Sequence, residues 1–266
     1  METRQSVGHY RQQAIFNILA LLIVIGVNAM ANLSQLNGKT TGEVSDAYPN
    51  LFVPAGFTFS IWSIIYLGLL GFVAYQYRLA FFNGHAIELQ AFMVRMKGWF
   101  LLSCLGNACW LFAWHYNMIF LSFCCMLVLL ASLIVIHRKF RIGHPGAFTP
   151  EKVFIHFPFG IYLGWISIAT IANLTALLVA WNIPIPQVTW TVVMMGLGTL
   201  LAVLVVFRYN NVYYALVCIW AFYGIIVKRE SIGGRECAPI VAMGTIVIAV
   251  LALSILMQLV RKKITI

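Results

Sequence analysis

The chain has 266 residues, of which 62% are hydrophobic and only 9% are charged, and its formal net charge is +10. This composition, with a mean hydropathy of +0.92, excludes an ordinary water-soluble domain and predicts a membrane protein. The positive charge does not indicate a nucleic-acid-binding protein, because no soluble segment combines a basic stripe with interleaved aromatic residues.

Eight uncharged stretches follow one another along the sequence, each close to the roughly 20 residues with which a helix crosses the hydrocarbon core. They lie at about residues 14–33, 54–77, 99–116, 117–136, 153–181, 187–207, 210–227 and 238–260. A lipid-facing barrel would show strands of alternating polarity, whereas these stretches are apolar all round. The sequence therefore predicts an all-α bundle of eight transmembrane helices, in which "HYN" at 115–117 separates the third helix from the fourth.

The basic residues predict the orientation of this bundle. If the spans alternate from a cytoplasmic start, thirteen of the 17 Lys and Arg residues lie on the inside, and only Lys39, Lys228, Arg229 and Arg235 lie outside. The positive-inside rule then places both termini in the cytoplasm. We expect a multi-pass protein of the plasma membrane.

The first stretch has an alternative interpretation. Arg4 and Arg11 precede an apolar run that ends in "AMA" at 29–31, as in a cleaved signal peptide, and cleavage would leave seven spans. The run is longer than the typical signal-peptide core of about 7–15 residues, which favours an uncleaved helix.

The interiors of the eight stretches hold no Asp, Glu, Lys or Arg. Ion-coupled transporters and proton pumps usually need such a group inside the membrane, so we expect neither. The six cysteines show no Cys-x-x-Cys spacing and no matching His spacing, which predicts buried thiols rather than a metal site.

Three of the predicted helices carry aromatic residues, with amides or hydroxyls, at spacings that share one helix face. The candidate residues are Phe57, Phe59, Trp62 and Tyr66 in the second helix, Asn107, Trp110 and Trp114 in the third, and Tyr162, Trp165, Ala169 and Asn173 in the fifth. Gly160 and Gly164 also form a small-xxx-small pair that would admit another helix closely. Packing alone could explain each stripe, but three converging stripes favour a pocket for a flat apolar ligand.

These motifs resemble those of the tryptophan-rich sensory protein and translocator protein family. "PAGFTFSIWSIIY" at 54–66 is similar to the family's second helix, "LGNACW" at 105–110 to its third, and "YLGWISIATIAN" at 162–173 to its fifth. The resemblance implies a five-helix core over residues 1–182, and it leaves residues 183–266 as three additional helices without a counterpart. It also implies a pocket for porphyrins, sterols or benzodiazepine-type ligands, a signalling or transport-related role, and often a dimer.

The chain departs from the family pattern in two places. Ala55 and Phe57 replace the second proline and the first Trp of the second-helix motif. The loop after the first helix lacks the family's Trp-Tyr pair and instead holds Glu43 and Asp46. Because that loop covers the family's pocket, the ligand of this chain is expected to differ.

We therefore expect a membrane sensor or carrier of a hydrophobic planar molecule, with Trp62, Trp110 and Trp165 stacking on it and Asn107 and Asn173 orienting it. A facilitative transporter of a neutral solute is the alternative, although no internal repeat supports it. A porphyrin-degrading enzyme ranks last, because we find no metal-ligand set, nucleophile with a base, or paired acids. No enzymatic activity and no required cofactor are expected.

Porphyrin or haem is a candidate ligand, and the expected partners are membrane lipid, a hydrophobic small molecule and a second copy of the chain. A chain stopped after "WNIPIP" at 181–186 is expected to insert and to retain most ligand binding.

Overall fold

The computed structural model describes residues 2–33, 35–82, 84–184 and 186–261. These residues contain helices and no strand, which confirms the predicted all-α bundle. The long helices are α1 (Glu2–Asn32), α3 (Ile61–Phe81), α5 (Trp99–His115), α6 (Ile119–Lys139), α8 (Phe157–Ala180), α9 (Gln187–Tyr209), α10 (Val212–Ile232) and α11 (Cys237–Val260). Shorter elements are α2 (Thr41–Asp46), α4 (Ala86–Met96), α7 (Thr149–Glu151), the 3₁₀ turns η1 (Leu36–Gly38) and η2 (Gly56–Ser60), and the π-helical turn η3 (Lys152–His156).

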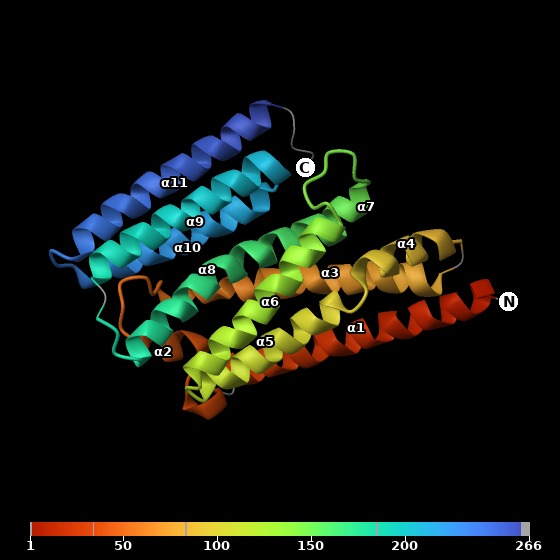
Figure 1. Cartoon of the computed structure of the whole chain (residues 1–266), viewed down its shortest axis with the longest axis horizontal. Helices are drawn as coiled ribbons and strands as arrows, with labels where there is room; N and C mark the ends of the chain where they lie inside the picture. Colours follow the sequence, from red (N-terminus) through yellow and green to blue (C-terminus); the bar gives the residue numbers. More distant parts are fainter. Residues whose placement is uncertain (1, 34, 83, 185, 262–266) are drawn as a thin grey trace.

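Seven helical segments in the described ranges are long and apolar enough to cross a membrane, rather than the eight predicted. The difference lies in the stretch at 99–116, which forms α5, a helix of 17 residues. At 1.5 Å per residue α5 is about 26 Å long, slightly less than the hydrocarbon thickness. It still lies along the bundle axis beside α1 and α6, so the chain passes in this direction once more than the seven segments alone would require (Figure 1).

The start of α1 and the end of α11 lie at the same end of the bundle (Figure 1). The ends of α3, α6 and α9 lie there too, and each of these helices carries basic residues in its last turn. Lys228, Arg229 and Arg235 lie at the opposite end, where α10 turns into α11. The predicted separation of basic residues is therefore present along the bundle axis, while Lys262 and Lys263 fall outside the described residues.

The last three helices pack on the rest through α10, which lies along α8 (Figure 1). Gly160 and Gly164 of α8 make this approach close: a Cβ atom on Gly164 would lie 3.0 Å from the carbonyl oxygen of Tyr214, and one on Gly160 would lie 2.9 Å from Oδ1 of Asn211. The small-xxx-small pair predicted to admit another helix thus faces the start of α10. One continuous set of buried hydrophobic residues extends through all the long helices.

Candidate ligand-binding site

A small apolar cavity lies between α5, α8 and α10, under the loop that joins α1 to α3. Its volume is about 40 Å³, which is room for about three water molecules. The lining residues are Ser45, Phe52, Pro54, Phe59, Trp110, Trp114, Trp165, Ile168, Ala169, Ala172, Asn173, Ala221 and Ile225. Six of the eleven predicted site residues are among them: Phe59, Trp110, Trp114, Trp165, Ala169 and Asn173.

Trp62 contacts aromatic residues of all three predicted stripes, beside this cavity. Its ring centroid lies 5.5 Å from that of Tyr66, 5.9 Å from those of Trp110 and Tyr162, and 6.2 Å from that of Trp165. These neighbours come from α3, α5 and α8, and the Trp62 side chain is only 4% exposed. The three aromatic stripes therefore do converge, as their spacing indicated.

Asn107 holds the three helices together at the floor of this cluster. Its side-chain Nδ2 donates a hydrogen bond of 2.7 Å to the hydroxyl of Tyr162, and the hydroxyl of Tyr66 donates one of 3.4 Å to its Oδ1. Asn107 is fully buried and does not line the cavity. Its contacts match interhelical packing rather than the orientation of a ligand.

Asn173 differs from Asn107 because it lines the cavity. Its Nδ2 donates to the hydroxyl oxygen of Ser122 on α6 at 3.1 Å. The amide therefore fixes α8 against α6 and still borders the space that a ligand would occupy.

The structure does not bring Phe57 to the cavity. The chain turns through η2 before α3 begins, and this turn directs Phe57 away from the helix face that carries Trp62. Its side chain is 43% exposed, and its ring packs edge-on against Trp220 and Tyr223 of α10, with centroids 5.3 and 6.1 Å apart. The predicted start of this helix at about residue 54 is wrong, because η2 occupies Gly56–Ser60 and α3 begins at Ile61.

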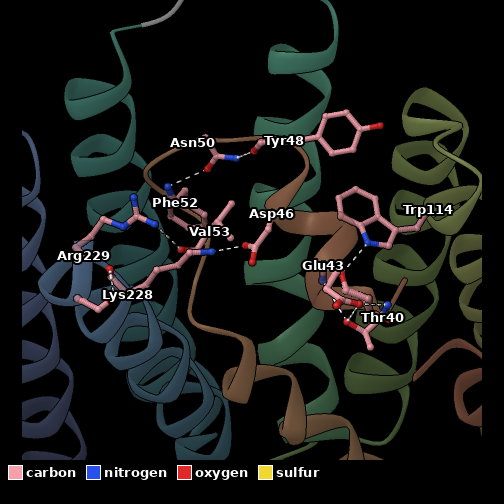
Figure 2. A network of polar contacts seen from close by, with 12 residues as sticks. Thr40, Glu43, Asp46, Tyr48, Asn50, Phe52, Val53, Trp114, Lys228 and Arg229 are labelled. Carbon is pink, nitrogen blue, oxygen red and sulfur yellow. Dashed lines mark hydrogen bonds and ion pairs between the residues drawn. The ribbon is translucent and has the colours of Figure 1, made fainter. Parts of the chain in front are cut away.

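The loop between α1 and α3 contains its own short helix, α2 (Figure 2), and Ser45 of this helix lines the cavity. Thr40 and Glu43 form a capping box at its start: the Thr40 amide donates to the Glu43 carboxylate at 2.7 Å, and the Glu43 amide donates to the Thr40 hydroxyl at 3.3 Å. The hydrogen bonds from Thr40 lower the pKa of the Glu43 carboxyl. Trp114 Nε1 donates to the carbonyl of Thr41 at 3.2 Å, which anchors α2 on α5.

Sequence reasoning missed the lining residues of this loop and of α10. These residues are Ser45, Phe52, Pro54, Ala221 and Ile225. The Thr-x-x-Glu spacing at 40–43 was a readable signal for α2, because it is the pattern of a capping box. No comparable signal marked the α10 residues, since apolar residues along a transmembrane helix look alike.

A family model described as TSPO-like protein matches residues 14–257. The chain belongs to the TSPO-like protein family. No curated protein and no solved structure matches the chain. The match extends through α9 and α10 and into α11, so this family includes the three helices that have no counterpart in the five-helix pattern. The division at residues 182 and 183 into two separate parts stays a prediction.

Three indole N–H groups of this TSPO-like protein remain as free donors around the aromatic cluster. The Nε1 atoms of Trp62, Trp110 and Trp165 are buried and have no acceptor among the described residues. A buried Trp N–H usually finds a hydrogen-bond partner, so an oxygen atom brought by a ligand would satisfy an unmet requirement here.

Proposed function

We propose that this membrane protein of the TSPO-like family binds a planar hydrophobic molecule between its tryptophans and acts as a sensor or carrier, without catalysing a reaction. The observation that carries the proposal is the cluster around Trp62, where four rings from three helices surround one indole beside an apolar cavity. Such a site favours flat apolar ligands by contact and stacking.

The free indole N–H groups narrow the class of ligand. A ligand that carries carbonyl or carboxylate oxygens would accept hydrogen bonds from Trp62, Trp110 or Trp165. Porphyrin and haem have this combination of a flat ring system and oxygen acceptors, and they remain the candidate ligands. The proposal requires no resident cofactor.

The cavity must widen to accept a molecule of this size, and a groove beside it supplies a route. The groove has a volume of about 440 Å³ and is lined by residues of α1, α2 and the start of α3, including Asn28, Gly42 and Trp62. Phe59 lines both the groove and the cavity, so its ring stands between the two spaces. Movement of Phe59 would connect them.

An absorbance titration of the full chain in detergent with protoporphyrin tests the proposal. We expect a spectral shift that saturates at micromolar ligand. Ala172→Leu, which adds bulk on the cavity wall, should weaken binding about tenfold, or about 1.4 kcal/mol. Ala131→Leu is the matched control, because Ala131 is exposed on α6. A titration without saturation, or an Ala172→Leu variant that binds like the parent, would overturn the proposal.

We also propose that the protein lies in the plasma membrane with both termini in the cytoplasm. The supporting observation is that the basic residues concentrate at the end of the bundle where α1 begins and α11 ends. Association of two copies, which the family resemblance implies, stays a prediction.

A further inference from the structure

Arg229 is a buried cation near the end of α10, and no carboxylate of the described residues forms an ion pair with it. Its side chain is only 4% exposed. Its one hydrogen bond is a long contact of 3.4 Å from Nη2 to the carbonyl of Val53, and its Nε has no acceptor among the described residues (Figure 2). The nearby carboxylate of Asp46 is paired with Lys228 instead.

This position leaves the Nε of the arginine without a hydrogen-bond partner among the described residues. Arg229 lies at the end of the bundle that is poor in basic residues, so the positive-inside rule does not explain it. A buried charge without a partner destabilises the fold, and a hydrogen bond to one carbonyl offsets only part of that cost. The Nε and Nη2 atoms form one edge of the guanidinium, and that edge has the geometry to hold a carboxylate with two parallel hydrogen bonds.

Arg229 borders a hollow in which a ligand group has room. The hollow has a volume of about 410 Å³ and is also lined by Asn50, Val53, Gln187 and Lys228. The single carboxylate on its wall, that of Asp46, is the partner of Lys228. Asp46 therefore leaves the Nε of Arg229 without an acceptor among the described residues, and an added acid group would supply one.

The hollow and the aromatic cavity lie on two sides of the same stretch of chain, residues 51–54. Phe52 and Pro54 line the cavity, whereas Leu51 and Val53 line the hollow. Helix α10 continues from one to the other, because Ile225 lines the cavity and Arg229 follows it by one helical turn. A molecule with a flat apolar part and a short acidic arm could occupy both sites once this stretch moves.

We propose that Arg229 binds the carboxylate of an amphiphilic ligand whose planar part occupies the aromatic cavity. This inference rests on the proposed function, and it adds the acidic group that the ligand must carry. Capture of the carboxylate uses Nε and Nη2, so the contact of Nη2 with Val53 is exchanged for the ligand. That exchange frees residues 51–54 at the moment when the cavity has to widen.

The test compares two pyrene probes, pyrenebutyric acid, which carries a free carboxylate, and its methyl ester, which is neutral and larger by one methyl group. Binding to the full chain in detergent is measured by energy transfer from tryptophan to pyrene. The parent protein should bind the acid about tenfold more tightly than the ester. Arg229→Gln should remove this preference and leave the affinity for the ester within about twofold. Arg235→Gln, which removes one exposed positive charge at the same end of the bundle, should keep the preference.

The remaining outcomes of this experiment each contradict a specific part of the proposal or test it with a second variant. Equal binding of acid and ester by the parent overturns the role of Arg229 and leaves the proposed function standing. Binding of neither probe by the parent overturns both. If Arg229→Gln does not fold, Arg229→Lys keeps the buried charge but lacks the two-pronged edge, and it should prefer the acid by less than about threefold. An undiminished preference in Arg229→Lys overturns the proposal.

Discussion

Gly224 on α10 lies directly against Thr58 in the turn that precedes α3. A Cβ atom on Gly224 would lie 2.0 Å from Oγ1 and 3.0 Å from Cβ of Thr58. Two hydrogen bonds flank this contact: the amide of Ala55 donates to the carbonyl of Gly224, and Trp220 Nε1 donates to the carbonyl of Thr58, both at 2.9 Å. This junction attaches the last three helices to the roof of the aromatic cavity.

Replacement of Gly224 by Ala should destabilise the protein. The added methyl group has no space unless the turn at Thr58 moves, and overpacking of this kind costs about 1–3 kcal/mol. Thermal unfolding in detergent measures the effect. Gly26→Ala is the control, because nothing lies within 4 Å of a Cβ atom at Gly26, and it should unfold no earlier than the parent. Equal unfolding temperatures for the two variants would show that the turn at Thr58 moves to accommodate the methyl group without loss of stability.

A chain stopped after Pro186 should lose most of its ligand binding. This expectation reverses the one drawn from the sequence, because Ala221 and Ile225 of α10 form part of the cavity wall. The truncation also removes the contacts of Trp220 and Gly224 with the roof of the cavity. The measurement is the protoporphyrin titration on a shortened chain that has been shown to insert. Undiminished affinity would show that residues 1–186 form the site by themselves.

Tyr162→Phe should cost more stability than Tyr66→Phe. The hydroxyl of Tyr162 accepts a hydrogen bond of 2.7 Å from Asn107, whereas that of Tyr66 donates a longer one of 3.4 Å to the same amide. Interhelical polar contacts are worth about 0.6 kcal/mol on average and about 1.7 kcal/mol at most, and the shorter bond should lie nearer the upper value. A double-mutant cycle with Asn107→Leu measures the coupling of each pair. A larger coupling for Tyr66 than for Tyr162 would contradict the geometry.

The closure of the loop over the cavity should weaken in acid. The pKa of Glu43 is lowered from its ordinary value of 4.5, because Thr40 hydrogen-bonds to the carboxylate. The stabilisation of α2 is thus fully present above pH 4.5 and is lost as the pH falls through the lower pKa of the folded protein. Hydrogen exchange at the Val44 amide, which donates to the Thr40 carbonyl, reports on α2. The quantity compared is the protection of this amide relative to an unstructured peptide at the same pH. In Glu43→Gln this protection should not change over the range, and a pH dependence equal to that of the parent would implicate another group.

Reporters that are active on only one side of the membrane should give opposite signals at the two ends of α11. The helix runs from Cys237 to Val260, so a fusion at residue 266 and an insertion in the turn at 233–236 lie on opposite sides if it spans. The fusion at residue 266 should give the cytoplasmic signal. The same signal at both positions would show that α11 does not cross the membrane.

The sequence alone determined that the chain is a helical membrane bundle and that three of its helices each carry a tryptophan on an aromatic face. The bilayer satisfies no backbone hydrogen bonds, so each apolar stretch has to be helical, and the spacing of Trp62, Trp110 and Trp165 places each ring on the same helix face as its neighbouring site residues. The uncharged apolar stretches predicted the lengths of almost all the long helices. The exceptions are the starts of α1 and α3, which lie at Glu2 and Ile61 rather than at about residues 14 and 54.

Only the tertiary structure decided which side chains remain available to a ligand. The side-chain amide of Asn107 is hydrogen-bonded to two tyrosines, and η2 directs Phe57 away from the cavity. Helix α10 forms part of the cavity wall, although Ala221 is 56 residues from Trp165 in the sequence. Periodicity assigns a residue to a face of its own helix, but it does not say which other helix covers that face. That choice depends on how closely whole helices can pack, which small contacts such as those of Gly160, Gly164 and Gly224 determine.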